Sequence, residues 1–193
     1  MTPSTRSFDI NGRHYAPPAR PLAVICIDGS ADEYISVSLA HGRMPHLDAM
    51  QRRGYRGMIR GALPSFTNVN NSAIVTGVPP AQTGICGNYF LDPSTGQEVM
   101  MNAPEYLRVD TILAAAARAG RRVAMVTAKD KLRAILSKGM DGIAFSSEKA
   151  REANRAVNGI DNVEALVGPT PPIYSGEASL YVLRAGVRLL EEG

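Results

Sequence analysis

A run of small hydroxyl and amide residues, SFTNVNN, occupies residues 65–71, just before an apolar segment with a helical pattern. Such side chains often cap helices, because they bond the free N–H groups of the first turn. A hydroxyl at this place also lies beside the positive end of the helix dipole, which stabilises an alkoxide and an incoming anion. Thr67 is therefore a candidate nucleophile as well as a candidate cap.

Other candidate residues follow strand-like segments. Asp28 ends the apolar run PLAVICID, and Lys129 and Lys131 lie in AKDK, after the run RRVAMVT. Asp28 could be a hard oxygen ligand for a divalent metal, or simply part of an Asp-Gly turn. The lysines could bind a second anionic group, or be solvated charges on either side of a helix-capping Asp130. Asn88, in CGNYF, could donate to a phosphoryl oxygen or shape a turn.

The elements that would position these residues alternate between strand and helix. Strands are predicted in PLAVICIDGS, YRGMIRGAL, RRVAMVTAKD and the start of GIAFSSEKAREAN, and the rest of this last segment is predicted to be a polar helix. Helices are predicted in MPHLDAMQRRG, TNVNNSAIVTG, VDTILAAAARAG, KLRAILSKG and EASLYVLRAGVRLLEEG, and a hairpin in GICGNYFLDPSTGQEVMMN. This order predicts an α/β fold with a mostly parallel central sheet and helices on both faces. In such folds ligands bind at the carboxyl ends of the strands, where the candidate residues stand.

Composition narrows the class of protein. The 193 residues are 45% hydrophobic and 20% charged, which suits a soluble globular domain. A net charge of +3, dispersed basic residues and the absence of Trp argue against nucleic-acid binding. Cys26 and Cys86 are too few for a disulfide scaffold and suggest a reducing compartment. No signal peptide or membrane-length apolar run is recognisable, so we predict a cytoplasmic protein without membrane contact.

The motifs ICIDG, PSFTNVNNSAIVTG and TGICGNYF, in this order, resemble those of the alkaline phosphatase superfamily, in its phosphodiesterase-like branch. The segment TAKDKLR makes the sequence most similar to the phosphonoacetate hydrolase family within that branch. The resemblance covers nearly the whole chain from Pro21 onward. It implies an alkaline phosphatase-like core, of which residues 1–193 are the N-terminal part of a single catalytic domain, incomplete at the C-terminus.

The resemblance also implies roles for individual residues. Asp28 would be a zinc ligand, and Thr67 both a zinc ligand and the nucleophile. Asn88 would hydrogen-bond the phosphoryl group, while Lys129 and Lys131 would hold the substrate carboxylate. The implied reaction is zinc-dependent hydrolysis of the carbon–phosphorus bond of phosphonoacetate, an anionic small molecule, to acetate and phosphate through a phosphothreonine. Two zinc ions would complete the site, and a homodimer is compatible with the family.

The sequence departs from the family in its histidines. The superfamily takes further zinc ligands from Asp and His residues later in the chain, including an adjacent Asp-His pair. Here the histidines are His14, His41 and His46, and none of them follows Thr67. We therefore expect the remaining zinc ligands to lie outside this chain, which by itself would be inactive.

Two alternative functions stay open at this point. Another phosphodiesterase or nucleotide pyrophosphatase of the superfamily would share Asp28, Thr67 and Asn88 but would not need the lysine pair. A non-catalytic anion-binding domain would use the helix N-terminus at Thr67 without any metal.

Overall fold

The computed structural model describes residues 6–192, which divide into two units. The smaller unit is Val24–Gly61 and the larger unit comprises the rest. The helices of the smaller unit are α1 (Asp32–Ala40) and α2 (Pro45–Arg53). The elements of the larger unit are β1 (Phe8–Ile10), β2 (Arg13–Tyr15), α3 (Thr67–Thr76), α4 (Pro80–Thr83), β3 (Tyr89–Leu91), β4 (Glu98–Met100), η1 (Pro104–Tyr106), α5 (Ile112–Arg118), β5 (Ala124–Thr127), α6 (Asp130–Leu136), β6 (Ile143–Ser146), η2 (Ala150–Glu152), α7 (Arg155–Asn158), α8 (Val163–Val167) and α9 (Gly176–Glu192).

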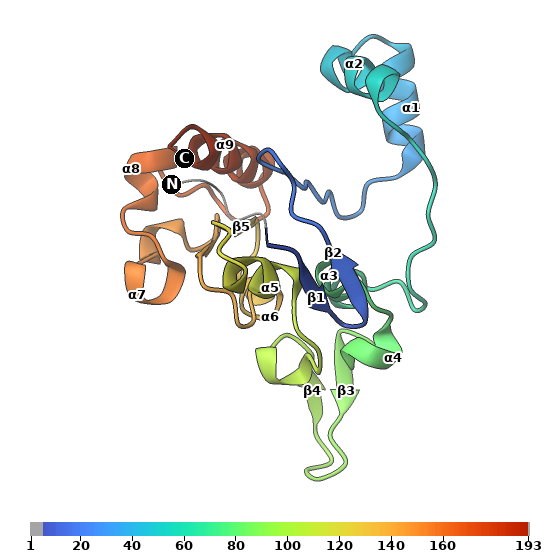
Figure 1. Cartoon of the computed structure of the whole chain (residues 1–193), viewed down its shortest axis with the longest axis vertical. Helices are drawn as coiled ribbons and strands as arrows, with labels where there is room; N and C mark the ends of the chain where they lie inside the picture. Colours follow the sequence, from blue (N-terminus) through green and yellow to red (C-terminus); the bar gives the residue numbers. More distant parts are fainter. Residues whose placement is uncertain (1–5, 193) are drawn as a thin grey trace. The chain divides into compact units, whose positions relative to one another are not determined.

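The strands form three two-stranded sheets. β5 and β6 are parallel, with Ala124 opposite Ile143, and α6 connects them. β3 and β4 form the predicted hairpin, which extends away from the helices of its unit in Figure 1. The mixed α/β class is confirmed. Within residues 6–192, however, the parallel part of the structure is this single pair of strands, and no larger central sheet is formed.

The predicted strands at residues 21–30 and 55–63 are wrong for the structure, which has no strand in either segment. Their apolar side chains are exposed, by 76% at Val24, 68% at Ile27 and 91% at Ile59. A strand exists only where a neighbour accepts its backbone hydrogen bonds, and no described strand pairs with these segments. The apolar pattern indicates what the segments could bury, but it does not supply the partner.

The predicted helices follow their local signals. α3 ends at Gly77, which adopts the left-handed conformation with φ +71° and donates its N–H to the carbonyl of Ala73. α5 begins after Thr111, whose hydroxyl accepts from the N–H of Ala114 at 3.0 Å. α2 starts with Pro45 at its first position. The predicted polar helix after β6 is only a 3₁₀ turn, η2.

The β1–β2 hairpin was not predicted, although it has a local signal. Its turn is Asn11-Gly12, with φ values of 49° and 74°, and the Asn-Gly pair favours this two-residue hairpin turn. The Asn11 amide donates to the carbonyls of Thr76 and Asp110, both at 2.9 Å. One side chain therefore fixes the hairpin to the end of α3 and to the chain before α5.

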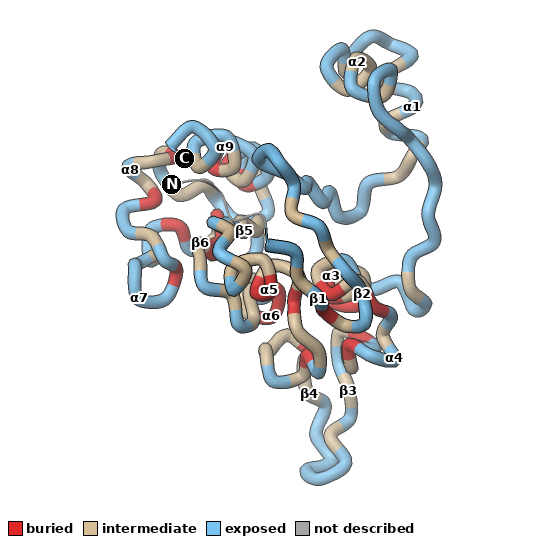
Figure 2. The backbone as a smooth tube through the Cα atoms, in the orientation of Figure 1, coloured by how far each residue is buried: buried red, intermediate tan, exposed pale blue. Residues whose placement is uncertain are grey.

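Two hydrophobic clusters hold the larger unit together. In Figure 2 its buried residues lie on α3, α5, α6 and α8, among other segments. The residues of the first cluster come from α3, α6 and the segments between them: Val69, Ile85, Met101, Leu107, Ile135 and Leu136. The residues of the second cluster surround β6, η2, α8 and α9: Phe145, Ala150, Val163, Val167, Tyr181 and Ala185. α6 bridges both regions, since it packs on α3 and on the β5–β6 pair.

Candidate active site

Thr67 is the first residue of α3 and is half-buried. The N-cap position belongs to Phe66, so the simple cap explanation for Thr67 is wrong. Neighbouring amides hold this turn instead. Asn71 donates to the carbonyl of Thr67 at 2.9 Å, and Asn70 donates to the carbonyl of Phe66 at 3.2 Å while accepting from the N–H of Ala62 at 2.8 Å. The amide side chains of Asn70 and Asn71 thus hold the first turn of α3, and Thr67 stands at its first helical position, not at its cap.

The residues after Thr67 seat this helix start on the core. Asn68 is only 3% exposed, and its amide donates to the carbonyl of Met101 at 2.7 Å. Val69 is fully buried in the first hydrophobic cluster. A side chain at the first position of α3 therefore projects from a helix that is fixed by both packing and hydrogen bonds.

Asn88 lies in the loop between α4 and β3. Its carbonyl accepts from the N–H of Met101 at 2.8 Å, which ties the loop to the end of β4. Its side-chain Oδ1 is buried and has no hydrogen-bond partner among residues 6–192. A buried polar atom without a partner costs about 1–3 kcal/mol, and a bound ligand can remove that cost. The orphaned oxygen could accept from a donor group of a ligand, whereas a phosphoryl oxygen would need the Nδ2 donor of the same amide.

Lys129 and Lys131 flank the start of α6, directly after β5. Both are exposed, and both line one pocket of about 270 Å³. The other residues that line this lysine pocket are Asp130, Glu148, Lys149, Ile173 and Tyr174. The structure thus brings the two predicted lysines together at the carboxyl end of a strand, as the sequence predicts. Thr67 and Asn88 are not among the residues that line it.

Asp130 does not cap α6, contrary to the sequence prediction. The carboxylate of Glu148 accepts the N–H of Asp130 at 2.7 Å, and the Asp130 carboxylate accepts from Arg133 at 2.8 Å and from the Ser146 hydroxyl at 3.0 Å. Partial burial raises the pKa of Asp130, but these hydrogen bonds and the charges of Arg133 and Lys149 outweigh it, so the pKa is lowered overall. The ionised carboxylate anchors the first turn of α6, next to the two lysines.

Asp28 lies in the smaller unit, in an exposed turn where the N–H of Ser30 approaches the carbonyl of Ile27 at 3.4 Å. Gly29 provides the positive φ of this turn, +72°. Asp28 thus lies in an Asp-Gly turn, and its role as a metal ligand stays a prediction. Loss of solvent around the sulfur and the charge of Asp28 both raise the pKa of the Cys26 thiol.

The described residues do not form a zinc site by themselves. Zinc usually takes four ligands, and residues 6–192 contain no group of three or more His, Cys, Asp or Glu side chains placed to hold a metal. Asp28 and Thr67 suit a divalent metal in kind, as oxygen donors, but not in number. Of the histidines, His14 pairs with Asp9 at 2.9 Å, and His41 bonds the carbonyl of Val37 at 2.8 Å.

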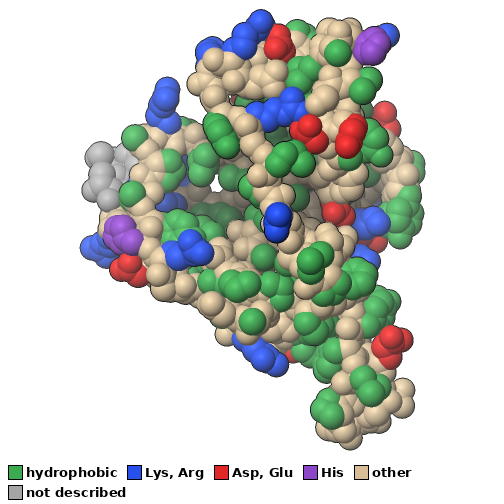
Figure 3. Space-filling model, turned by 90° about the vertical axis from the view of Figure 1, so that its right-hand side faces the viewer, with side chains coloured by type: hydrophobic (Ala, Val, Ile, Leu, Met, Phe, Trp, Pro, Cys, Tyr) green, Lys and Arg blue, Asp and Glu red, His purple; other side chains and the backbone are tan. Residues whose placement is uncertain are grey.

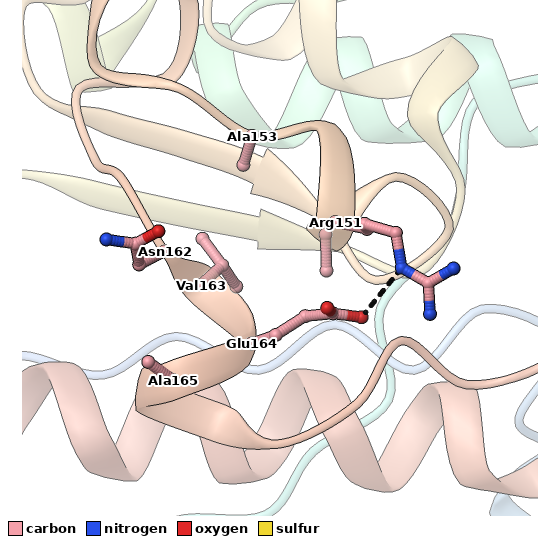
Figure 4. A pocket seen from close by; sticks show the side chains of 7 residues that line it. Arg151, Ala153, Asn162, Val163, Glu164 and Ala165 are labelled. Carbon is pink, nitrogen blue, oxygen red and sulfur yellow. Dashed lines mark hydrogen bonds and ion pairs between the residues drawn. The ribbon is translucent and has the colours of Figure 1, made fainter.

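A second pocket, of about 140 Å³, lies between η2 and α8. In Figure 4 the side chains of Arg151 and Glu164 point toward each other across it, and their Nε and Oε1 atoms are 3.3 Å apart. Glu164 also accepts from the N–H of Thr170 at 2.8 Å. Because its charges neutralise each other, this pocket is a weaker candidate than the lysine pocket.

Comparison with known proteins decides the family. The model of the type I phosphodiesterase / nucleotide pyrophosphatase family matches residues 22–159. The chain belongs to this family. The matched range includes all the predicted site residues, whereas Tyr174 of the lysine pocket lies beyond it. The predicted resemblance to the phosphodiesterase-like branch is confirmed.

Two solved structures of one enzyme are similar to nearly the whole chain. The phosphonoacetate hydrolase from Sinorhizobium meliloti 1021 in complex with phosphonoformate is 49% identical, with a TM-score of 0.90 over 98% of this chain. The same enzyme in complex with phosphonoacetate is 48% identical, with the same TM-score and coverage. This chain spans about half of that enzyme, 47% of its length.

A further similar protein, at lower identity, is an uncharacterized pyrophosphatase/phosphodiesterase from Schizosaccharomyces pombe. It is 35% identical over 85 residues, which are 44% of this chain and 17% of that protein.

Within residues 6–192, no helix has the length and apolar character needed to cross a membrane. On the face shown in Figure 3, Lys and Arg side chains stand singly or in small groups among other residues, without one concentrated basic patch.

Proposed function

We propose that this chain acts in the hydrolysis of phosphonoacetate to acetate and phosphate. The observation that carries the proposal is the 49% identity over 98% of the chain to a phosphonoacetate hydrolase. The lysine pocket supports the same substrate, because it places two ammonium groups after the parallel strand β5. The phosphonate and the carboxylate of the substrate would then be bound by different parts of the chain.

Thr67 is the proposed nucleophile. Its Oγ1 would lose its proton and attack phosphorus, forming a phosphorus–oxygen bond as the carbon–phosphorus bond breaks. The start of the ten-residue helix α3 stabilises negative charge on the transferred group. Water would then hydrolyse the phosphothreonine and release phosphate. Asn88 is proposed to hydrogen-bond the phosphoryl group.

Lys129 and Lys131 are proposed to solve the problem of the leaving group. The electron pair of the broken carbon–phosphorus bond stays on carbon. The resulting carbanion is unstable unless its charge is delocalised into the neighbouring carboxylate. Two ammonium groups at that carboxylate stabilise the resulting enediolate more strongly than the ground state, which lowers the barrier. Protonation of the carbon then yields acetate.

The proposed reaction uses bound zinc, and the described residues supply only part of the zinc ligands. Asp28 and Thr67 would each contribute one oxygen, and the other ligands must come from outside the described residues. Bound zinc would favour the alkoxide form of the threonine hydroxyl. The proposal predicts near-stoichiometric zinc in the purified full-length protein, whereas a non-catalytic anion-binding domain would contain none.

The remaining structural expectations are part of the same proposal. A mostly parallel central sheet with helices on both faces would cover the apolar residues of segments 21–30 and 55–63, with residues 1–193 as the N-terminal part of one catalytic domain. Slow amide exchange in these segments of the full-length protein would support this, and rapid exchange would oppose it. A homodimer and a cytoplasmic location stay predictions.

A general phosphodiesterase or nucleotide pyrophosphatase is the second candidate, and the description of the matching family favours it. The experiment that separates the two compares substrates on the full-length protein. Phosphate release from phosphonoacetate should exceed turnover of an aryl phosphodiester and of a nucleoside triphosphate. Preference for either of these over phosphonoacetate would put the second candidate first.

A further inference from the structure

Tyr174 has an unusual backbone conformation. In the described part of the chain, the residues other than glycine with positive φ are Asn11, Asn162 and Tyr174, at 49°, 54° and 62°. Asparagine tolerates the left-handed region, but a bulky aromatic residue is disfavoured there. The chain therefore keeps a tyrosine at a position where asparagine or glycine would be less strained.

The turn around Tyr174 is fixed by its neighbours. The hydroxyl of Ser175 donates to the carbonyl of Pro172 at 2.6 Å and accepts from the N–H of Ala178 at 3.2 Å. These bonds join the turn to the first residues of α9. They hold the backbone of Tyr174 in place without involving its side chain, so they do not explain why the side chain is aromatic.

The ring of Tyr174 does not serve the hydrophobic core, because the residue is 80% exposed. Its contact is with the lysine pocket instead. The Nζ atom of Lys129 lies over the ring, 4.5 Å from its centroid, in the geometry of a cation–π contact. The contact joins the loop before α6 to the turn before α9, which are distant in sequence.

The other charges of the pocket leave this ammonium available. The carboxylate of Asp130 is engaged by Arg133 and Ser146, and that of Glu148 by a backbone N–H. Within residues 6–192 no carboxylate forms an ion pair with Lys129, and a lysine ammonium on a flexible four-carbon stem loses much freedom when it binds a ligand. An aromatic face restricts that freedom while leaving N–H donors for an anion.

We propose that Tyr174 is a positioning residue, whose ring holds the ammonium of Lys129 in the place where the substrate carboxylate binds. The inference rests on the proposed function, in which Lys129 meets that carboxylate. Ordering the cation before binding reduces the entropy lost in the complex, so the ring favours carboxylate substrates. A phosphate ester without a carboxylate gains nothing from it.

The test uses the full-length protein with two variants. Tyr174→Asn tolerates the positive φ but removes the ring, and Tyr174→Phe keeps the ring as the matched control. With phosphonoacetate, Tyr174→Asn should lower kcat/KM about two- to fivefold, mainly through KM, whereas Tyr174→Phe should retain it. Turnover of an aryl phosphate ester should not change in either variant, and the melting temperature of Tyr174→Asn should not fall.

Two further measurements connect the effect to Lys129. In a Lys129→Ala background, Tyr174→Asn should cause no additional loss, because both changes remove the same contact. In proton NMR of the protein labelled at lysine, the side-chain methylene signals next to the Lys129 ammonium should be shifted upfield by the ring. Tyr174→Asn should abolish that shift and Tyr174→Phe should preserve it.

The inference is overturned if Tyr174→Asn matches the parent enzyme on phosphonoacetate while Lys129→Ala is impaired. Equal losses on both substrates, or a loss in Tyr174→Phe as large as in Tyr174→Asn, would also overturn it. If Lys129→Ala itself leaves phosphonoacetate turnover unchanged, the proposed carboxylate site has failed, and the positioning role fails with it. The Lys129→Ala result thus tells the two failures apart.

Discussion

The start of α3 and the start of α6 both carry proposed site residues, but they hold them in different ways. Thr67 begins a helix whose next residues, Asn68 and Val69, are buried, so packing and neutral hydrogen bonds fix its position. Lys129 is the N-cap residue of α6 and Lys131 is the second residue of that helix, and both are exposed. The start of α6 is fixed by an ionic network around the Asp130 carboxylate and, at Lys129, by an aromatic ring.

The difference matches the two tasks. A nucleophile must be placed accurately relative to one atom, which favours a helix seated on a core. Side chains that recognise a charge tolerate more movement, because the attraction falls slowly with distance. Changes at the start of α3 should therefore affect every substrate, whereas changes at the start of α6 should affect carboxylate substrates.

The largest effect is expected from Thr67→Ala in the full-length protein. Loss of the nucleophile should lower turnover of phosphonoacetate and of an aryl phosphate ester alike, by about 10⁴-fold or more. The melting temperature should stay close to that of the parent, since Phe66 occupies the N-cap position. Phosphate release and thermal unfolding measure the two properties.

Thr67→Ser is the matched control for this change and should keep partial activity, because it retains a hydroxyl. Near-normal turnover by the alanine variant would remove Thr67 from the mechanism. The anion-binding interpretation of the helix start would then gain support.

Lys129→Ala and Lys131→Ala should produce the next largest effect. Each removes a charge-assisted contact worth about 1.5–3 kcal/mol, or about ten- to 150-fold in kcat/KM for phosphonoacetate. An aryl phosphate ester should be affected much less. Lys149→Ala is the control, because the ammonium of Lys149 is already 3.7 Å from the carboxylate of Asp130.

Parallel losses on both substrates would contradict the carboxylate assignment and favour the general phosphodiesterase. No loss on either substrate would mean that the two lysines are ordinary solvated charges. Either outcome would also end the distinction between the start of α3, which serves all substrates, and the start of α6, which serves carboxylates.

Asn68→Ala should weaken the support of the helix start. It leaves the buried carbonyl of Met101 without its 2.7 Å hydrogen bond, which should lower the free energy of unfolding by about 1–3 kcal/mol. Asn71→Ala, in the same helix, should cost less, because the bond of Asn71 to the carbonyl of Thr67 is only partly buried. Urea unfolding of the variants compares them. Equal stabilities would show that the core contact at Asn68 contributes little.

The smallest effect is expected from Asp130→Asn, which tests the ionic support of the start of α6, where both lysines lie. The pKa of Asp130 is lowered in the folded chain, so its carboxylate stabilises the fold above the unfolded pKa of about 3.9, and this stability is lost as pH falls through the folded pKa. At pH 7 the variant should lose about 1 kcal/mol of unfolding free energy. The difference from the parent should shrink in strong acid.

Thermal unfolding of Asp130→Asn at several pH values measures this dependence. Asp161→Asn is the control, since the ion pair of Asp161 with Arg155 is more exposed than that of Asp130 with Arg133. If the stability difference between Asp130→Asn and the parent stays constant down to strong acid, Asp130 contributes through its shape and not through its ionisation.

Much of the local structure was determined by the sequence alone. The helical period and Gly54 predicted α2, and the polar start and Gly77 predicted α3. The placement of Lys129 and Lys131 after a strand followed from an apolar run and its ending. The β1–β2 hairpin was equally predictable from Asn11-Gly12. These features depend on residues within a few positions of one another, so one stretch of sequence contains the cause.

Only the tertiary structure decided the features that join distant segments. Residues 21–30 are as apolar as a buried strand but form none, because a strand requires a hydrogen-bonding neighbour. Glu148, not Asp130, bonds the first N–H of α6, and Tyr174 meets Lys129. Each of these contacts depends on how the chain returns to itself. Composition and periodicity describe what a segment can bury or bind, whereas the folded chain selects the partner.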